Sequence, residues 1–161
     1  MQARFFPLLV LLPVLGQPPS PPPAPRPTDQ AIVIVNPGNP LQDIKQADLK
    51  KILSLQVKHW PHKDRIQLYL PKTGSKAQRI LLKKVFKMNI KKLKRYFAKL
   101  LYTNKISSKP KTAGTIKSIK MVMKKKGGIA VIMRSALPKG IKVKILKVEG
   151  KAPGDKGYPL Q

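Results

Sequence analysis

Hydrophobic and polar positions alternate along the chain with two different periods. Three segments are apolar or alternating runs that predict strands: residues 31–35 (AIVIV), 66–70 (IQLYL) and 127–133 (GGIAVIM). A fourth, residues 141–148 (IKVKILKV), mixes apolar residues with lysine, and we expect its apolar side chains to point inward. The two continuous runs are typical of strands that are buried on both faces.

Four other segments carry apolar residues at the helical spacing of three to four positions. In residues 75–88, one face collects the apolar side chains, which belong to Ala77, Leu81, Val85 and Met88. The remaining predicted helices cover residues 46–55, 89–101 and 115–126. Strands that alternate with helices predict an α/β fold, a three-layer sandwich with a mostly parallel central sheet.

The two ends of the chain differ from its centre. Residues 1–16 contain one basic residue, Arg4, and then an uncharged apolar run that suits a signal peptide and is too short for a membrane span. Residues 17–30 are dense in proline and predict a semi-rigid linker. Residues 31–150 form the predicted domain, and residues 151–161 are expected to be a flexible tail. We therefore expect an exported protein, periplasmic or secreted, with no transmembrane span in the mature chain.

Positive charge dominates the composition. The chain has 34 Lys and Arg against 6 Asp and Glu, a formal net charge of +28, and no acidic residue lies between Asp64 and Glu149. Such a chain attracts polyanions, whether nucleic acid, anionic lipid or polysaccharide. There is no cysteine, which excludes disulfides and thiolate chemistry.

Catalytic and metal-binding patterns are weak. His59 and His62, with Asp64 nearby, fall short of a metal site, and we expect Trp60 between them to anchor the loop to the core. No Ser-His-Asp arrangement is suggested, and the letters TGSK lack the upstream glycine of a Walker loop. We therefore expect a protein that is not an enzyme and holds no metal or cofactor.

The letters LPKTG, residues 70–74, match a wall-sorting signal, but a long, lysine-rich remainder of the chain follows them. The same stretch predicts a strand end, a loop and a helix start, because Ser75 and Gln78 have the spacing of a capping box. The N–H groups of a helix start can hold phosphate, sulfate or a carboxylate without a metal. Side chains that carry a full positive charge lie nearby in the sequence, namely Lys72, Lys76 and Arg79. An ordinary capped surface helix is the alternative.

The letters NPGNP, residues 36–40, follow the first predicted strand and turn the chain. Open α/β sheets usually bind ligands beyond the carboxyl ends of their strands. Asn36 and Asn39 are therefore further candidates for contact with an anion.

Five segments, taken in order, carry a family resemblance: AIVIVNPGNPLQDIKQADLKKIL, a single Trp, LPKTGSKAQRILLKKVF, LKRYFAKLLYT and GGIAVI. Together they cover about residues 31–148. Their order and spacing resemble the short phosphate ABC-transporter substrate-binding-like family of exported bacterial proteins. The resemblance implies an α/β fold like one lobe of a type II periplasmic binding protein.

The resemblance also implies a ligand and a binding loop. Full-length relatives close two lobes around phosphate, and a loop of Ser, Gly and Thr at a helix start holds it. The matching positions in this chain are Thr73, Gly74 and Ser75, with Arg79 on the following turn. This chain has T-G-S-K where the fuller family motif is G-S-G-T.

Two functions stay open from the sequence. The first is an exported, non-enzymatic module like a substrate-binding protein, which binds phosphate or a similar oxyanion at the Ser75 helix start. The second is an exported basic protein that binds a polyanion, or serves in an envelope complex, and has no small-molecule ligand. Steep weakening of binding with salt would favour the second.

Overall fold

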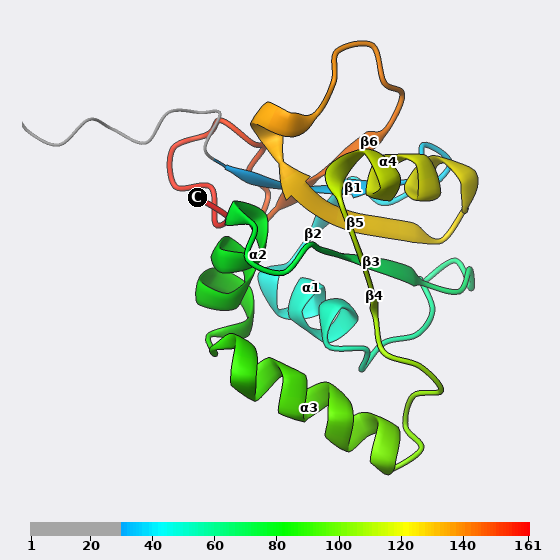
Figure 1. The fold of residues 1–161 in the computed structure, drawn as a ribbon. Helices are drawn as coiled ribbons and strands as arrows, with labels where there is room; N and C mark the ends of the chain where they lie inside the picture. Colours follow the sequence, from blue (N-terminus) through cyan, green and yellow to red (C-terminus); the bar gives the residue numbers. More distant parts are fainter. Residues whose placement is uncertain (1–29) are drawn as a thin grey trace, which may run out of the picture.

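The computed structural model describes residues 30–161. The predicted signal peptide, residues 1–16, and all of the predicted linker except Gln30 lie outside the described residues. The described strands form a six-stranded sheet (Figure 1), namely β1 (Ala31–Val35), β2 (Asp43–Ile44), β3 (Gln67–Pro71), β4 (Lys111–Ala113), β5 (Gly128–Met133) and β6 (Lys144–Val148). The helices are α1 (Gln46–Leu53), α2 (Lys76–Ile80), α3 (Ile90–Tyr102) and α4 (Thr115–Lys124), with a π-helix η2 (Leu81–Phe86) and a 3₁₀ turn η3 (Arg134–Ala136).

β1 runs against all the other strands. The order across the sheet is β2-β6-β1-β5-β3-β4, and β1 pairs antiparallel with both of its neighbours, β5 and β6. The other pairings, β3 with β4, β3 with β5 and β2 with β6, are parallel. Every strand except β1 therefore has the same direction, which confirms the predicted α/β fold with its mostly parallel sheet. The reversal places the carboxyl end of β1 at the end of the sheet where the other strands begin.

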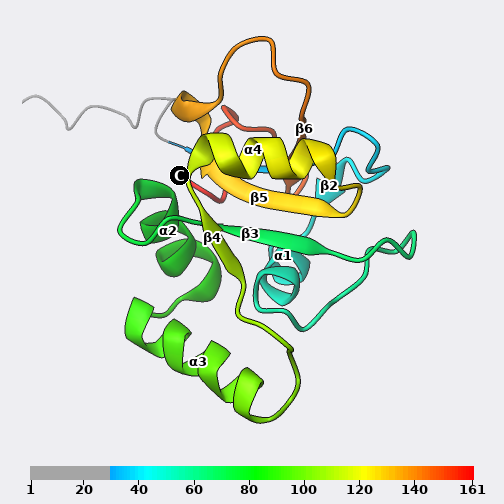
Figure 2. The ribbon, with the colours of Figure 1, turned by 45° about the vertical axis from the view of Figure 1, so that its right-hand side comes forward.

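Helices cover both faces of the sheet, which explains the unbroken apolar run of β1 (Figure 2). Ala31, Val33 and Val35 belong to the core cluster that contains α1, η2 and α3. Ile32 and Ile34 belong to a second cluster, with α4. All five side chains are fully buried, and each fully buried valine or isoleucine stabilises the fold by about 1.5–3 kcal/mol.

The predicted helix at residues 75–88 is interrupted. α2 gives way to the π-helix η2, whose wider turn keeps Leu81, Val85 and Phe86 buried. The helix then ends at Lys87, which adopts a left-handed conformation with φ 52°. Asn89 starts α3, since its side-chain oxygen accepts a 2.8 Å hydrogen bond from the N–H of Lys92. None of the helices in residues 30–161 combines the length and the apolar character that a membrane crossing needs.

The last residues are packed, which differs from the flexible tail expected for residues 151–161. Tyr158 and Leu160 are only 1% and 0% exposed and belong to the core cluster under β1. The carbonyl oxygen of Leu160 accepts a hydrogen bond of 2.9 Å from the N–H of Ala31. Two apolar side chains spaced two residues apart are enough to dock this otherwise polar segment. The folded unit therefore extends beyond residue 150, the predicted end of the domain.

Candidate anion-binding site

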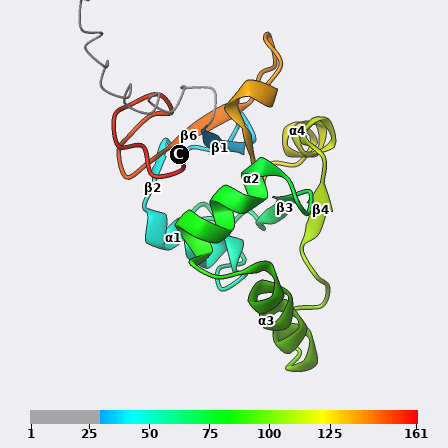
Figure 3. The ribbon, with the colours of Figure 1, turned by 60° about the vertical axis from the view of Figure 1, so that its left-hand side comes forward.

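Two helices begin beyond the carboxyl ends of two paired strands, on opposite faces of the sheet. Pro71 of β3 lies beside Ala113 of β4 in parallel register, and a helix follows each strand, α2 at Lys76 and α4 at Thr115. Figure 3 brings this edge forward and shows α2 and α4 on either side of β3. The turn η3 follows β5 at the same edge. These are the carboxyl ends of parallel strands, where open α/β sheets bind ligands.

The start of α2 is capped by its own side chains. Oγ of Ser75 accepts a hydrogen bond of 3.2 Å from the N–H of Gln78, and Oε1 of Gln78 accepts one of 2.7 Å from the N–H of Gly74. This is the predicted capping arrangement, except that the glutamine reaches Gly74 instead of Ser75. Gly74 has φ +82°, a conformation that favours glycine. The N–H of Thr73 has no acceptor within residues 30–161.

The start of α4 has no side-chain cap. Its N-cap residue is Gly114, so the N–H groups of the first turn, on Thr115, Ile116 and Lys117, have no capping side chain. The helix dipole adds about half a positive charge at this end. Gly114 and Thr115 are not among the site residues predicted from the sequence, although a helix was predicted from residue 115. The signal that could have found them is a Gly-Thr pair directly before a segment of helical periodicity.

Positive charge surrounds both helix starts. The exposed basic residues of the two loops and first turns are Lys72, Lys76, Arg79, Lys117 and Lys120. No acidic residue lies between Asp64 and Glu149 in the sequence. Within residues 30–161, Asp48 forms an ion pair with Lys51 and Asp64 lies beside His62, and neither acidic residue lies on these loops. The edge therefore favours an anion.

Arg134 joins the C-terminal segment to the same edge. It follows β5, and its Nη1 donates a hydrogen bond of 2.6 Å to the carbonyl oxygen of Pro153. Tyr158, in the same segment, is buried, and burial raises the pKa of its phenol far above the ordinary value of 10.0, while the charge of Arg134 acts in the opposite direction. Arg134 is thus engaged in holding the C-terminal segment, and its charge still contributes to the positive edge.

Asn36 lies at the opposite end of the sheet. Asn36 follows β1, and because β1 is reversed, its last residue, Val35, pairs with Ile129 near the beginning of β5. The side-chain amide of Asn36 donates to the carbonyl oxygens of Val122 and Met123, at 3.0 and 2.9 Å, and its oxygen accepts from the N–H of Gly38. Asn36 therefore caps the C-terminal end of α4 and shapes the turn.

Asn39 lies in the same turn and is only 1% exposed. Its side-chain oxygen accepts a hydrogen bond of 3.0 Å from the N–H of Leu41, and its carbonyl oxygen accepts one from Nζ of Lys144. Its Nδ2 is buried and has no hydrogen-bond partner within the described part of the chain. The structure thus groups Thr73, Gly74, Ser75 and Arg79 and leaves both asparagines at the far end of the sheet.

The histidine pair belongs to a structural loop. Trp60 is 2% exposed, and its indole N–H bonds the carbonyl oxygen of Gly127 at 3.2 Å. The rings of Trp60 and His62 are stacked with centroids 6.1 Å apart. Nε2 of His62 lies 3.5 Å from Oδ2 of Asp64, too far for a well-formed hydrogen bond. Across residues 30–161 no group of three or more His, Cys, Asp or Glu residues could hold a metal ion.

The chain is similar to one family and to several solved structures. Residues 28–154 match the family model described as the PBP superfamily domain. No curated protein sequence matches the chain. A Clostridium perfringens protein assigned to phosphate ABC transport as a substrate-binding protein, solved with bound phosphate, is similar over 77% of this chain and 46% of its own, with a TM-score of 0.59 and 17% identity.

Two other solved structures give nearly the same values. An ABC-type phosphate transport receptor from Vibrio cholerae has a TM-score of 0.58 and 12% identity, over 77% of this chain and 48% of its own. PstS from Borrelia burgdorferi has a TM-score of 0.59 and 16% identity, over 77% and 49%. This chain thus spans about half the length of each of these proteins. At such low identity the likeness establishes a shared fold.

Proposed function

Because this chain belongs to the PBP superfamily domain family, we propose that it is a non-enzymatic substrate-binding module that takes phosphate or a similar oxyanion. The observation that carries the proposal is the pair of helix starts, α2 and α4, at the carboxyl ends of adjacent parallel strands. Both helix starts carry positive helix-dipole charge and basic side chains, and no acidic residue lies near either of them in the sequence. The solved structures named above are phosphate-transport proteins, which supports the choice of phosphate as first ligand to test.

Each part of the site has a defined role in this proposal. The uncapped first turn of α4, from Gly114, supplies backbone N–H donors. The N–H of Thr73 supplies another, while Ser75 and Gly74 hold the loop in shape through their bonds to Gln78. Arg79 adds a guanidinium, which can bind two oxygens of one anion. The open outer side of the site admits water, so we expect weak binding, with a shallower salt dependence than a polyanion would show.

The cellular location belongs to the same proposal. Residues 1–16 have the pattern of a bacterial signal peptide, which would place the mature protein in the periplasm or outside the cell. Fractionation of cells that express the full chain, with N-terminal sequencing of the product, tests this point. A product that retains Met1 and stays in the cytoplasm would exclude export.

The binding proposal is tested by calorimetric titration of the protein with phosphate and sulfate at constant ionic strength. We expect Ser75→Ala combined with Arg79→Ala to weaken binding at least tenfold. Arg95→Ala on α3 is the matched control, since it removes an exposed arginine outside the site and should leave the affinity unchanged. Absence of heat for the unaltered protein, or equal affinity of the double variant, would refute this site.

A proline substitution tests the α4 donors separately. Thr115 is the first residue of α4, a position that tolerates proline, and Gly114 already has the extended conformation, φ −68° and ψ 161°, that proline requires of its predecessor. Thr115→Pro therefore removes one N–H while the helix is kept. We expect weaker phosphate binding with unchanged circular dichroism. Thr115→Ser keeps the N–H and should keep the affinity.

The outer face of α3 favours a second candidate, polyanion binding. α3 buries Leu93 and Phe97, and its exposed basic side chains are Lys91, Lys92, Lys94, Arg95 and Lys99. If this face contacts a polyanion such as duplex DNA, the affinity should fall linearly on a log-log plot against salt, with a slope of about −0.9 for each phosphate contacted. Neutralising three of these residues should then flatten the slope. An unchanged slope would exclude α3 as the contact surface.

A further inference from the structure

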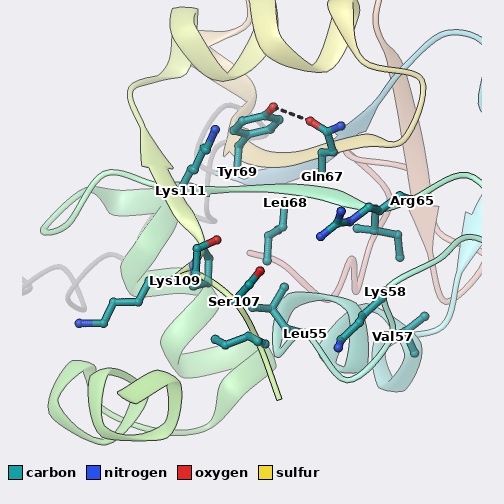
Figure 4. A pocket seen from close by; sticks show the side chains of 14 residues that line it. Leu55, Val57, Lys58, Arg65, Gln67, Leu68, Tyr69, Ser107, Lys109 and Lys111 are labelled. Atoms are coloured by element: carbon teal, nitrogen blue, oxygen red, sulfur yellow. Dashed lines mark hydrogen bonds between the residues drawn. The ribbon is translucent and has the colours of Figure 1, made fainter. Parts of the chain in front are cut away.

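A separate cleft runs along the free edge of β3, beside the first half of the strand (Figure 4). Its volume is about 320 Å³, within the range of about 300–1,000 Å³ that is usual for ligand pockets. The cleft exists because β4 pairs with β3 only at residues 69–71. Gln67 and Leu68 consequently have no strand partner on this side within residues 30–161.

The floor of the cleft is apolar. It is formed by Leu68 of β3, by Leu55 after α1 and by Ile106 from the segment before β4. Figure 4 shows Leu68 pointing away from β3 toward Leu55, with Ser107 beside them. Covering such a floor with an apolar group is favourable by about 25 cal/mol for each Å² removed from water.

Four basic residues contribute to the lining of the cleft, Lys58, Arg65, Lys109 and Lys111, and no acidic residue does. Lys58 and Arg65 lie on the same side of β3 as Leu68, whereas the side chains of Lys109 and Lys111 extend away from the cleft (Figure 4). None of these four side chains forms an ion pair or a hydrogen bond within the described part of the chain. Arg65 points into the cleft from just before β3 (Figure 4). A molecule bound here would therefore meet positive charge at the edge and apolar surface below.

We propose that this cleft binds a small organic anion, in which a carboxylate, sulfonate or phosphate ester is joined to a compact apolar body. The apolar body would cover Leu68 and Ile106, and the acidic group would pair with the guanidinium of Arg65, which suits planar, two-oxygen recognition. The hydroxyl of Ser107 provides a neutral donor. A peptide strand does not fit, because only two residues of the β3 edge are free and ordinary strands have about five or six.

The cleft is distinct from the helix-start site. Arg65 precedes β3, and Gln67 and Leu68 begin it, whereas Thr73 and Ser75 follow its carboxyl end. The two sites can therefore be tested independently, and substitutions at Ser75 and Arg79 should leave binding in the cleft unchanged.

The test uses naphthalene-2-sulfonate as the probe and calorimetry at constant ionic strength. Two matched molecules separate the contributions: naphthalene-2-sulfonamide keeps the ring without the charge, and inorganic sulfate keeps the charge without the ring. We expect the sulfonate to bind at least tenfold more tightly than either. Equal affinity for the sulfonamide, or for sulfate, would overturn the proposal.

Three variants locate the binding. Lys58→Gln combined with Arg65→Gln should weaken sulfonate binding at least tenfold. The control pair Lys139→Gln with Lys142→Gln removes the same charge from an exposed loop elsewhere and should change the affinity less than twofold. Ser107→Phe fills the cleft at an exposed position without changing charge and should abolish binding. Unchanged binding in Ser107→Phe, or equal losses in the two double variants, would show that the probe follows overall charge and not this cleft.

Discussion

The indole N–H of Trp60 donates a 3.2 Å hydrogen bond to the carbonyl oxygen of Gly127, which joins the loop before β3 to the beginning of β5. The same oxygen accepts a hydrogen bond of 2.9 Å from the N–H of Gln67. The backbones are close enough that a Cβ on Gly127 would lie 1.9 Å from the carbonyl oxygen of Arg65. Glycine at this position is therefore a packing requirement of the sheet.

Gly127→Ala should destabilise the protein strongly, because the clash is with backbone atoms that cannot rotate away. Inserting one carbon into a close-packed site typically costs about 1–3 kcal/mol, and we expect a loss at or above the upper end. Urea denaturation measures it. Gly114→Ala is the control, since its Cβ would meet nothing within 4 Å, and similar losses for the two variants would contradict this explanation.

Leu160→Ala should lower the free energy of unfolding by about 2–5 kcal/mol, the usual cost of removing a fully buried leucine side chain. The residue is 0% exposed although it is the penultimate one of the chain. Thermal or urea unfolding is the measurement. Lys156→Ala, exposed in the same segment, should have little effect; if Leu160→Ala has equally little, the segment is not docked in solution.

The phenol of Tyr158 should make stability depend on alkaline pH. Its pKa is raised by burial, so the folded state keeps the proton at pH values where the unfolded chain has lost it. The contribution of the Tyr158 phenol to stability is therefore complete below about pH 10, the ordinary pKa of tyrosine. It decreases as the pH rises further. Tyr158→Phe removes this contribution. The difference in unfolding free energy between the two proteins should be constant below pH 9 and should then shift in favour of the variant, and a flat difference would contradict the assignment.

Asn36→Ala should affect stability and not anion binding. It removes the two hydrogen bonds that cap the C-terminal end of α4. The buried carbonyl group of Val122 is then left without this partner, which costs about 1–3 kcal/mol. The residue is at the far end of the sheet from Ser75, so the phosphate affinity of the folded variant should equal that of the unaltered protein. A tenfold weaker affinity would mean that the turn at Asn36 takes part in the site after all.

Local features were predictable because their signals lie within a few residues. The Ser75 cap rests on a bond to Gln78, three positions away, and the strand β1 rests on five consecutive apolar residues. Trp60 was predicted to anchor its loop because a single tryptophan among polar residues is rarely exposed, and its burial follows that expectation.

Non-local features were not predictable in the same way. β4 has only three residues, with little apolar pattern, and it is defined by its pairing with β3. The helix at residues 115–126 was predicted, but its position next to the Ser75 helix start was not. The direction of β1 depends on partners about a hundred positions away, and that direction removes Asn36 from the site. In β6 the inward alternation fails at Ile145, which is 38% exposed, because the strand turns Leu146 and Val148 into the core.

The reversed strand β1 also bears on the order in which the chain can fold. Ala31 pairs with Met133, and Val33 pairs with Leu146, so the first strand of the described domain is completed by the last two long strands. During synthesis, β1 emerges with five apolar residues and has no partner until nearly the whole chain has followed. Pairing across such distances is slow to form, and an unpaired apolar strand is prone to aggregate. We therefore expect that residues 31–35 need protection from aggregation while the protein is being synthesised.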